Sequence, residues 1–516
     1  MTSSKTPSGV ATSAGLQVVA PRPALSRNLM TVLLLTLAGG LLAPIWTVRY
    51  PPLVDYPFHL ATTFVLGHLK DPAFHFHEFY ASDWNTQPYL TMYIALVGLQ
   101  RIVSIYLAGR ILLSLCVLSV PAAAWFFLRQ ANPGEESLAC WSLLISHNLF
   151  FFLYGFLNFQ LGFALCLFIL GVWLRYLERP RWLTWCVLLA LTTALYFTHF
   201  QAFGIAGFVM TAYWVFSRRR IRDGLLSWAL FVPGALLYLH AMMGLKTRHG
   251  LIFRGLGGKL IGLVVVVLGY SPPLDFLTLL VVVGALFWAR YNPEFVWNRT
   301  WLRTVGCLFA LYWVFPAAYG VGMNADRRLL PFVAVLGLAT VRVGQPRGRE
   351  LAKIAVLLFF LRGGALEWHF VNLQPHLAKL ATSFPAIPKD ARVLPLVDWA
   401  GGAPLVEREF WAYGVIQRGW FTPCIFHDPG VEPFQVRLRT YDPYGPAFVD
   451  LESPDWKRIK TDYDFVWAYG VPQFSSALSS EGKVVFEGEN LQVFQMRKAS
   501  DEQTQGPWAP FEKSGN

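Results

Sequence analysis

The segment 158–177, NFQLGFALCLFILGVWLRYL, decides the class of fold. It holds one charged side chain, Arg175, near its end. An α-helix needs about 20 apolar residues to cross the hydrocarbon core of a bilayer. Across the whole chain 55% of the residues are hydrophobic and 14% are charged, whereas about 25% are charged in an ordinary soluble domain. We therefore predict a polytopic α-helical membrane protein.

Further apolar blocks repeat this pattern up to residue 367, with short basic or aromatic stretches between them. They are 29–47, 106–128, 137–153, 181–198, 201–217, 224–242, 274–290, 302–320, 327–343 and 350–367. Two shorter pieces, 88–101 and 257–270, have the length of interfacial or re-entrant segments. We expect about 11 to 13 transmembrane helices, all within a domain that spans residues 29–367.

The charges are distributed unevenly along the chain. The net charge is +12, yet residues 368–516 contain more acidic than basic side chains. Lys and Arg in short loops favour the cytoplasmic side, so residues 1–28 are expected in the cytoplasm, with the loop 48–105 and everything after residue 367 on the outer face. The arginines lie at span ends rather than on one soluble face, which argues against nucleic-acid binding.

The tail 368–498 is predicted to be a soluble α/β domain, followed by a disordered end, 499–516. Its strand-like apolar or aromatic runs, bounded by Gly, Pro and Asp, are Val393–Val397, 410–416, 465–467 and 484–494. Cys424 is the tail's single cysteine, because the other five lie in apolar spans. No disulfide within the tail is therefore expected.

The first outward loop has the densest set of candidate catalytic residues. It begins with Asp55-Tyr56-Pro57-Phe58-His59. A carboxylate near a span end, among aromatic residues, can be partly desolvated and act as a general base. The alternative is that Asp55 caps a short interfacial helix beginning at Pro57. The nearby His75 and His77 are compatible with a metal site, or with simple alternation on a solvated loop.

Two groups of charged residues lie near the outer ends of later spans. A phosphate could bind the first group, or its side chains could reach lipid headgroups without a ligand; it includes Lys246, Arg248 and Arg254. The second group is Asp326-Arg327-Arg328. Here an arginine could bind an anionic headgroup while Asp326 orients it, or the carboxylate and the guanidiniums could neutralise one another.

Polar residues also occur near the outward ends of two helices. Tyr154 and Asn158 form one group, and His199 belongs to the other. Polar side chains at this depth either bond neighbouring helices or line a substrate cavity. We keep all three as candidate substrate-binding residues.

This arrangement resembles the membrane-embedded glycosyltransferases of the GT-C class, in the bacterial group related to protein mannosyltransferases and aminoarabinose transferases. A first span is followed by a long outer loop with an early acidic residue, here Asp55. A half-embedded helix led by Pro88 comes next, and then a span with an arginine near its start, Arg110. A later span begins Arg-Arg-Leu-Leu-Pro, at 327–331. As an architecture, the resemblance covers nearly the whole chain.

The resemblance implies a reaction and roles for these residues. Asp55 would deprotonate an acceptor hydroxyl, assisted by His59, and the acceptor would attack a polyprenyl-phosphate-linked sugar with inversion. The lipid phosphate would bind Arg327, Arg328 and the 246–254 run. The chain departs from the pattern at two places: Tyr56 follows Asp55 where several relatives have a second acidic residue, and Asn158 replaces an acidic residue often found after a later span.

The function expected from this resemblance is sugar transfer to an unknown glycan, lipid or protein acceptor on the outer face of a bacterial inner membrane. No cofactor is required by the sequence, although a divalent metal stays open. Two alternatives remain. The chain could be a transporter or flippase for a lipid or glycan, although inverted repeats and charged midplane helices are not evident. It could also be a catalytically inactive membrane assembly protein.

Overall fold

The computed structural model describes residues 27–82, 84–243, 250–319, 323–398, 403–425, 433–436 and 454–497. The chain divides into two units, Met1–Gly39 and Gly40–Asn516. Helix α1 (Arg27–Trp46) begins in the first unit and ends in the second. The elements described below belong to the second unit.

Six helical segments are long and apolar enough to cross a membrane. They are α5 (Ile105–Ala131), α7 (Leu157–Glu178), α9 (Phe200–Ser217), the successive α10 (Ile221–Ala229) and α11 (Val232–Met243), α13 (Pro272–Tyr291) and α16 (Gln345–Ala381). Shorter helices are α4 (Leu90–Leu99), which precedes α5, and α8 (Trp182–Thr198), α12 (Leu256–Val265), α14 (Arg299–Val314) and α15 (Leu330–Gly337), which lie between the long segments in the sequence. The coarse prediction of a multi-helix protein with membrane-length spans is confirmed.

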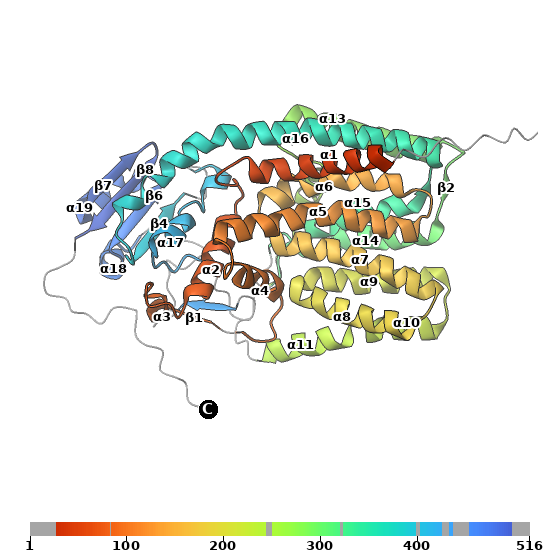
Figure 1. Ribbon diagram of the computed structural model, residues 1–516, viewed down its shortest axis with the longest axis horizontal. Coiled ribbons are helices and arrows are strands. Elements are labelled where there is room, and N and C mark those ends of the chain that lie inside the picture. The colour runs from red at the N-terminus through yellow and green to blue at the C-terminus, as the bar shows by residue number, and fades with distance from the viewer. Residues whose placement is uncertain are drawn as a thin grey trace, which may run out of the picture. The chain divides into compact units, whose positions relative to one another are not determined.

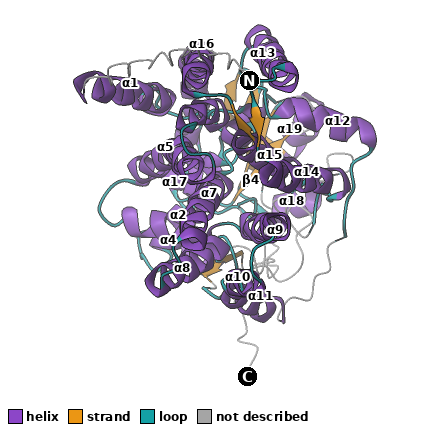
Figure 2. Ribbon diagram, turned by 90° about the vertical axis from the view of Figure 1, so that its right-hand side faces the viewer, coloured by secondary structure: helices purple, strands orange, loops and turns teal. Residues whose placement is uncertain are grey.

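Helices α5 and α7 form the most extensive packing interface of the bundle, and α8 and α9 lie against the other sides of α7 (Figures 1 and 2). Gly171 on α7 lets the two backbones approach, since a Cβ at this glycine would come within 2.7 Å of the Phe126 ring on α5. Helix α14 packs against α9 and α15, with Trp301 fully buried. Small residues at such crossings are typical of helix packing in membranes.

The apolar block 137–153 is not one helix, so the prediction of a single span there is wrong. It consists of the 3-10 helix η1 (Glu136–Ser142), the short α6 (Leu143–Ser146) and the single π-helical turn η2 (Leu149–Leu153). Asn148 breaks the segment because its Oδ1 accepts from the N–H of Phe150 at 2.8 Å. Its Nδ2 donates to three carbonyls at the end of α12, of which Val266 O is the nearest at 2.8 Å. An Asn side chain that bonds the backbone in this way competes with helix continuation.

Helix α16 is longer than the expected span 350–367. It has 37 residues, about 55 Å at 1.5 Å per residue, and a bilayer core is about 30 Å thick. Its far end carries Gln374, which holds the start of the loop 48–105. The side-chain oxygen of Gln374 accepts from the N–H groups of Arg49 and Tyr50, at 3.0 and 2.9 Å, and its Nε2 donates to Tyr50 O at 3.0 Å.

The C-terminal region contains a four-stranded sheet at one end of the helices (Figure 1). The strand order is β4 (Val393–Val397), β6 (Phe465–Tyr469), β8 (Leu491–Met496) and β7 (Gly482–Gly488). Strands β4 and β6 are parallel, and the other neighbours are antiparallel. Helices α17 (Ala412–Arg418), α18 (Trp456–Asp462) and α19 (Ser475–Glu481) accompany the sheet. The mixed α/β character predicted for the tail is confirmed.

One of the predicted tail strands is wrong. The run 410–416 lies mainly in helix α17, with residues Ala412–Ile416 of the helix buried. A short, continuously apolar run is compatible with either a buried strand or a buried helix, because it shows neither period clearly.

Further short elements of the chain are β2 (Val296–Trp297), β3 (Val341–Arg342), η3 (Arg327–Leu329), η4 (Leu338–Thr340), η5 (Phe384–Ala386), η6 (Leu405–Glu407) and η7 (Pro472–Phe474).

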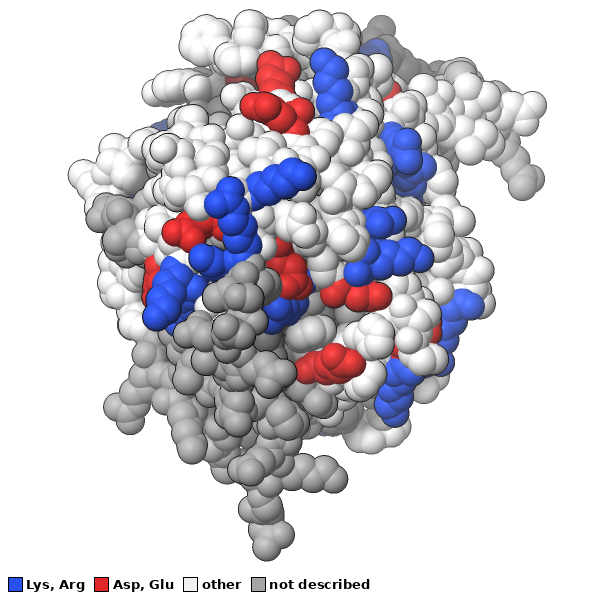
Figure 3. Space-filling view, turned by 90° about the vertical axis from the view of Figure 1, so that its left-hand side faces the viewer, with Lys and Arg blue, Asp and Glu red and all other residues white. Residues whose placement is uncertain are grey.

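The loop 48–105 and the C-terminal region pack together. The loop contains α2 (Tyr56–His68), α3 (Phe76–Phe79) and β1 (Tyr80–Ser82), and β1 pairs antiparallel with β5 (Phe434–Val436). Helix α2 packs against α17, where the rings of Phe58 and Trp411 lie 5.1 Å apart. The face of the molecule that carries the sheet shows both basic and acidic side chains, interspersed among uncharged ones (Figure 3).

Replacing Tyr80 with Phe should loosen this packing. The Tyr80 hydroxyl donates to Thr422 O at 2.8 Å and accepts from Thr422 N at 2.9 Å, all within buried residues. Its loss leaves both backbone groups unsatisfied, and we expect a destabilisation of about 1–3 kcal/mol, measured as a lower Tm in detergent. Tyr291→Phe is the control, since Tyr291 is 73% exposed. Equal Tm values for the two variants would contradict this role of Tyr80.

Candidate functional site

Asp55 lies at the N-terminal end of α2, in the N-cap position. Its backbone N–H donates to Tyr154 O at 3.0 Å, and that of Val54 donates to Leu153 O at 2.8 Å. The chain entering α2 is therefore fixed on the end of η2 by backbone hydrogen bonds. The predicted helix start is confirmed, but the Asp55 side chain makes no capping hydrogen bond, so its carboxyl is not used in the way that the capping alternative requires.

Gly155 allows this close approach. Its φ is +72°, in the left-handed region that favours glycine. A Cβ at this position would lie 3.0 Å from Tyr56 N and 3.2 Å from Asp55 N. The Tyr154-Gly155-Phe156 turn before α7 therefore sets the position of Asp55 from across the bundle.

The carboxyl of Asp55 has an unusual environment for an acidic group. The residue keeps partial solvent exposure, but its carboxyl lies deep among protein atoms. Burial raises the pKa of Asp55 from 3.8 to about 7, and the positive charge of Arg328 acts in the opposite direction. A carboxyl with a pKa near neutrality is well matched to general-base chemistry, because it can both accept and release a proton at that pH.

His59 lies one turn further along α2 and is buried. Burial lowers its pKa to about 3, so the imidazole is uncharged at neutral pH. The His59 ring is 6.4 Å from that of Tyr93 on α4. An uncharged His59 cannot supply a positive charge to Asp55, and any assistance it gives would be as a neutral group.

Arg328 links Asp55 to His199. Its guanidinium lies 4.7 Å from the centre of the Phe156 ring and 5.7 Å from that of Phe159, both near the start of α7. Its Nη1 is 3.3 Å from His199 Nε2. Cation–π contacts of this kind hold a guanidinium in place without neutralising its charge. Arg328 is thus positioned by aromatic rings and acts electrostatically on Asp55.

Arg327 lies beside Arg328 on η3 and is held in a similar way. Its guanidinium is 5.6 Å from the centre of the Phe150 ring, and it interacts electrostatically with Tyr154 and Arg254. Among the described residues, neither Arg327 nor Arg328 forms an ion pair, and the Nε of each is buried without a hydrogen-bond partner. The two guanidiniums therefore keep both charge and donors for an anion.

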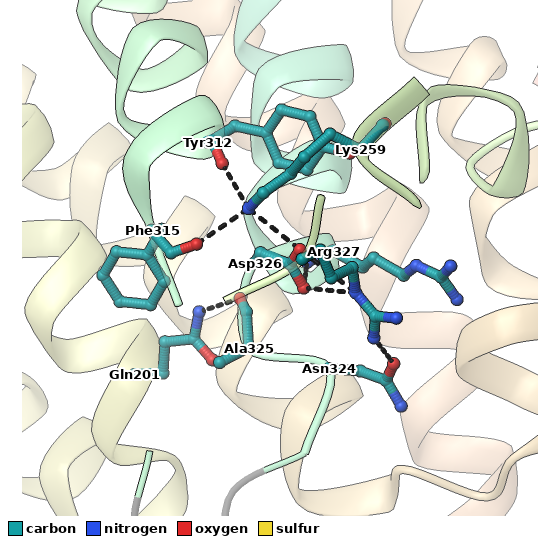
Figure 4. Close-up of polar contacts among 9 residues, drawn as sticks. Gln201, Lys259, Tyr312, Phe315, Asn324, Ala325, Asp326 and Arg327 are labelled. Atoms are coloured by element: carbon teal, nitrogen blue, oxygen red, sulfur yellow. Dashed lines mark hydrogen bonds and ion pairs between the residues drawn. The ribbon is translucent and has the colours of Figure 1, made fainter. Parts of the chain in front are cut away.

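Asp326 pairs with two other cations (Figure 4). Its carboxylate lies 2.9 Å from Lys259 Nζ and 3.2 Å from Arg254 Nε, and Asp326 itself is 0% exposed. Lys259 is also buried, at 3% exposure, and donates to the carbonyls of Tyr312 and Phe315 at 2.8 and 2.7 Å. The predicted orienting role of Asp326 therefore takes a different form, because its carboxylate accepts from the backbone N–H of Arg327 at 2.9 Å. Its charge is balanced by Lys259 on α12 and by Arg254, which precedes α12 in the sequence.

Arg254 is partly committed by these contacts. Besides Asp326, it hydrogen-bonds the side chain of Asn324, whose φ is +56°. Gln201 at the start of α9 donates to Ala325 O at 2.5 Å. These bonds fix the segment that precedes η3, and so they place Arg327 and Arg328. Lys246 and Arg248, the other predicted phosphate ligands in this region, lie outside the described residues.

The remaining predicted residues also lie around the turn that holds Asp55. Tyr154 supplies the carbonyl that binds Asp55, and its ring packs on that of Phe156, with centroids 5.4 Å apart. Asn158, in the first turn of α7, is half-buried, and its Oδ1 has no hydrogen-bond partner among the described residues. Contacts thus link Asp55 to Tyr154, the Tyr154 ring to that of Phe156, and Phe156 to Arg328, which also contacts His199.

The described histidines of the loop 48–105 do not gather into a ligand set. His75 Nδ1 lies 3.0 Å from Glu78 Oε1 on the same short helix. Within the part of the chain that the structure describes, no group of three or more His, Cys, Asp or Glu side chains is arranged to hold a metal ion.

Sequence reasoning missed one residue of this site, Glu409. It precedes α17 and is 5% exposed, and the negative charge of Asp55 acts on its carboxyl. More than 350 residues separate it from Asp55, so no local spacing could connect the two. The one available signal is compositional: Glu407-Arg408-Glu409 is a charged triplet inside a run of apolar and aromatic residues.

Comparison of the sequence with known protein families and with curated proteins finds no match. The chemistry of the site therefore has to be argued from its residues.

Gly155→Ala should displace Asp55. The new Cβ would press on the backbone N atoms of Tyr56 and Asp55, and the alanine would have to adopt a positive φ. Non-glycine residues in such conformations cost about 1–3 kcal/mol, so we expect a lower Tm. Gly204→Ala in α9 is the matched control, because its Cβ would have no atom within 4 Å and should be neutral or stabilising. A Tm for Gly155→Ala at or above that of the control would show that the approach is not tight.

The Lys259–Asp326 pair should show strong coupling. Lys259→Met leaves a carboxylate at 0% exposure with Arg254 as its remaining ion-pair partner among the described residues, and we expect a loss of about 3–5 kcal/mol. The double variant Lys259→Met with Asp326→Asn should recover most of it, because no buried carboxylate remains and the Arg254 side chain is 26% exposed and keeps its hydrogen bond to Asn324. Lys353→Met, at an exposed pair with Glu350, should cost at most about 1 kcal/mol. Simple additivity in the chemical-unfolding cycle would refute the coupling.

Proposed function

We propose that the chain is a polytopic inner-membrane glycosyltransferase of bacterial type, with about 11 to 13 membrane-crossing or half-crossing helices. It would transfer a sugar from a polyprenyl-phosphate-linked donor to a hydroxyl acceptor on the outer face, with the N-terminus in the cytoplasm. The observation that carries the proposal is the placement of a desolvated carboxyl, Asp55, beside an arginine without an ion-pair partner among the described residues, Arg328, at one end of the helix bundle.

Each component of the reaction has a matching group in this arrangement. The acceptor O–H gives its proton to Asp55, and its oxygen forms a bond to the anomeric carbon. The bond from that carbon to the phosphate oxygen breaks, and the electron pair leaves with the polyprenyl phosphate. The guanidiniums of Arg327 and Arg328 supply charge-assisted hydrogen bonds to the departing phosphate. Attack from the face opposite the leaving phosphate inverts the anomeric configuration.

The surroundings of the two arginines support a lipid-linked anion more than a soluble one. The site lies at the ends of apolar helices, so a polyprenyl tail could remain in the bilayer while its phosphate reaches the guanidiniums. Aromatic rings rather than carboxylates hold Arg327 and Arg328. A carboxylate partner would compete with a phosphate, whereas a ring face leaves the charge available.

Asp55→Asn should abolish transfer. The amide keeps the size of the side chain but cannot accept the proton at neutral pH, and loss of a general base lowers rates by about 10²–10⁴-fold. In the wild type the base must be ionised, so kcat/KM should rise with pH through about 7, the pKa to which burial raises Asp55. Both are measured with radiolabelled polyprenyl-phosphate sugars in membranes; Asp71→Asn, on the same loop, is the control.

Transfer by Asp55→Asn at the wild-type rate would remove Asp55 as the base. A pH profile that is flat between about 5 and 8, where an ordinary carboxyl is already ionised, would contradict the raised pKa. Lipid or glycan flux in liposomes by the purified protein, with no transfer under any condition, would favour a transporter instead.

A further inference from the structure

Like Asp55, Glu409 is an acidic residue whose carboxyl is buried. It comes from the C-terminal region, far from Asp55 in the sequence. Helix α17, which begins three residues after Glu409, packs on α2, which begins one residue after Asp55. The two carboxyls are close enough for the charge of Asp55 to act on Glu409. The fold therefore places a carboxyl from the C-terminal region near the N-terminal end of α2.

Glu407 and Arg408, which precede Glu409, both have partners, whereas Glu409 Oε2 has none within the described part of the chain. Glu407 Oε2 lies 3.1 Å from His376 Nε2 and also bonds the Tyr469 hydroxyl. Arg408 donates to Ala403 O at 3.0 Å. Among the described residues no Lys, Arg or His forms an ion pair with Glu409, and its Oε2 is buried without a hydrogen-bond partner. A carboxyl buried without a cation takes its uncharged form, because the charged form is too costly to desolvate.

The charged and titratable groups around Glu409 do not change this conclusion. Asp55 adds a negative charge, which disfavours ionisation of a second carboxyl. On the two packed helices the buried titratable groups are Tyr56 and His59 on α2 and Tyr413 on α17, and the charge of Arg110 on α5 acts on Tyr56 and Tyr413. Arg328 acts on Asp55 from the other side.

We infer that Glu409 is a second carboxyl of the Asp55 site, supplied by the C-terminal region, and that in its uncharged acid form it donates a hydrogen bond to the acceptor oxygen that Asp55 deprotonates. The acceptor role rests on the proposed function. Two carboxyls held in different protonation states can divide the work of base and donor in this way. The C-terminal region is then part of the active site.

Substitutions at Glu409 separate a donor from a base and from a structural residue. An amide keeps the size, the neutrality and the donor, so Glu409→Gln should keep kcat/KM within about threefold of the wild type. Glu409→Ala removes the donor and should lower kcat/KM by about tenfold or more. Both variants should keep a Tm close to that of the wild type, because Glu409 forms no ion pair among the described residues, whereas Glu407→Gln, which breaks the pair of Glu407 with His376, should lower the Tm. Equal losses in Glu409→Gln and Glu409→Ala would overturn the donor role.

Infrared spectroscopy tests the protonation state without any substrate. At about pH 8, where ordinary carboxyls are ionised, the wild type should show a protonated-carboxyl C=O band that disappears in Glu409→Gln and persists in Glu407→Gln. Persistence of the whole band in Glu409→Gln would overturn the inference. Because the band is recorded on the protein alone, it decides the state of Glu409 even if the chain transfers no sugar, so a failure of the proposed function remains distinguishable.

Discussion

The rest of the site depends on the buried ion pairs of the Asp326 carboxylate with Lys259 and Arg254. A carboxylate with no solvent exposure needs compensating charge, and Lys259 and Arg254 provide it. The same carboxylate accepts from the backbone N–H of Arg327 and so starts η3. Asp326 forms its ion pairs with cations of another segment, and among the described residues it forms none with Arg327 or Arg328. Their charges stay available beside Asp55, held by aromatic rings.

The position of Asp55 depends on contacts from three distant parts of the chain. Carbonyls of η2 and the turn after it bind the backbone of Val54 and Asp55. Gln374, on the projecting end of α16, binds the backbone at Arg49 and Tyr50. The C-terminal region closes over α2 through α17 and brings Glu409. A carboxyl that several elements hold in a desolvated place would need little reorganisation if it accepts a proton during a reaction.

The membrane-length helices could be predicted from the sequence because a run of about 20 apolar residues is the length that a helix needs to cross the hydrocarbon core of a bilayer. The interruption at Asn148 could not, since it follows from side-chain hydrogen bonds to the end of α12, over 115 residues away. The run 410–416 gave no decisive period, and it folded as a helix. Asp55 and the Arg327-Arg328 pair were recognisable from their places at span ends. Glu409 was not, because it comes near Asp55 only after the C-terminal region has packed on the loop 48–105.

The central claim is that Asp55 and the Arg327-Arg328 pair face one lipid-linked sugar phosphate. A structure of the full chain in a lipid nanodisc, determined with a polyprenyl-phosphate sugar bound, tests it most directly. The account predicts phosphate oxygens within hydrogen-bond distance of Arg327 or Arg328, and the anomeric carbon on the side of Asp55. A donor whose phosphate binds at the other end of the helices, near β2 (Figure 1), with Asp55 not facing the sugar, would contradict it.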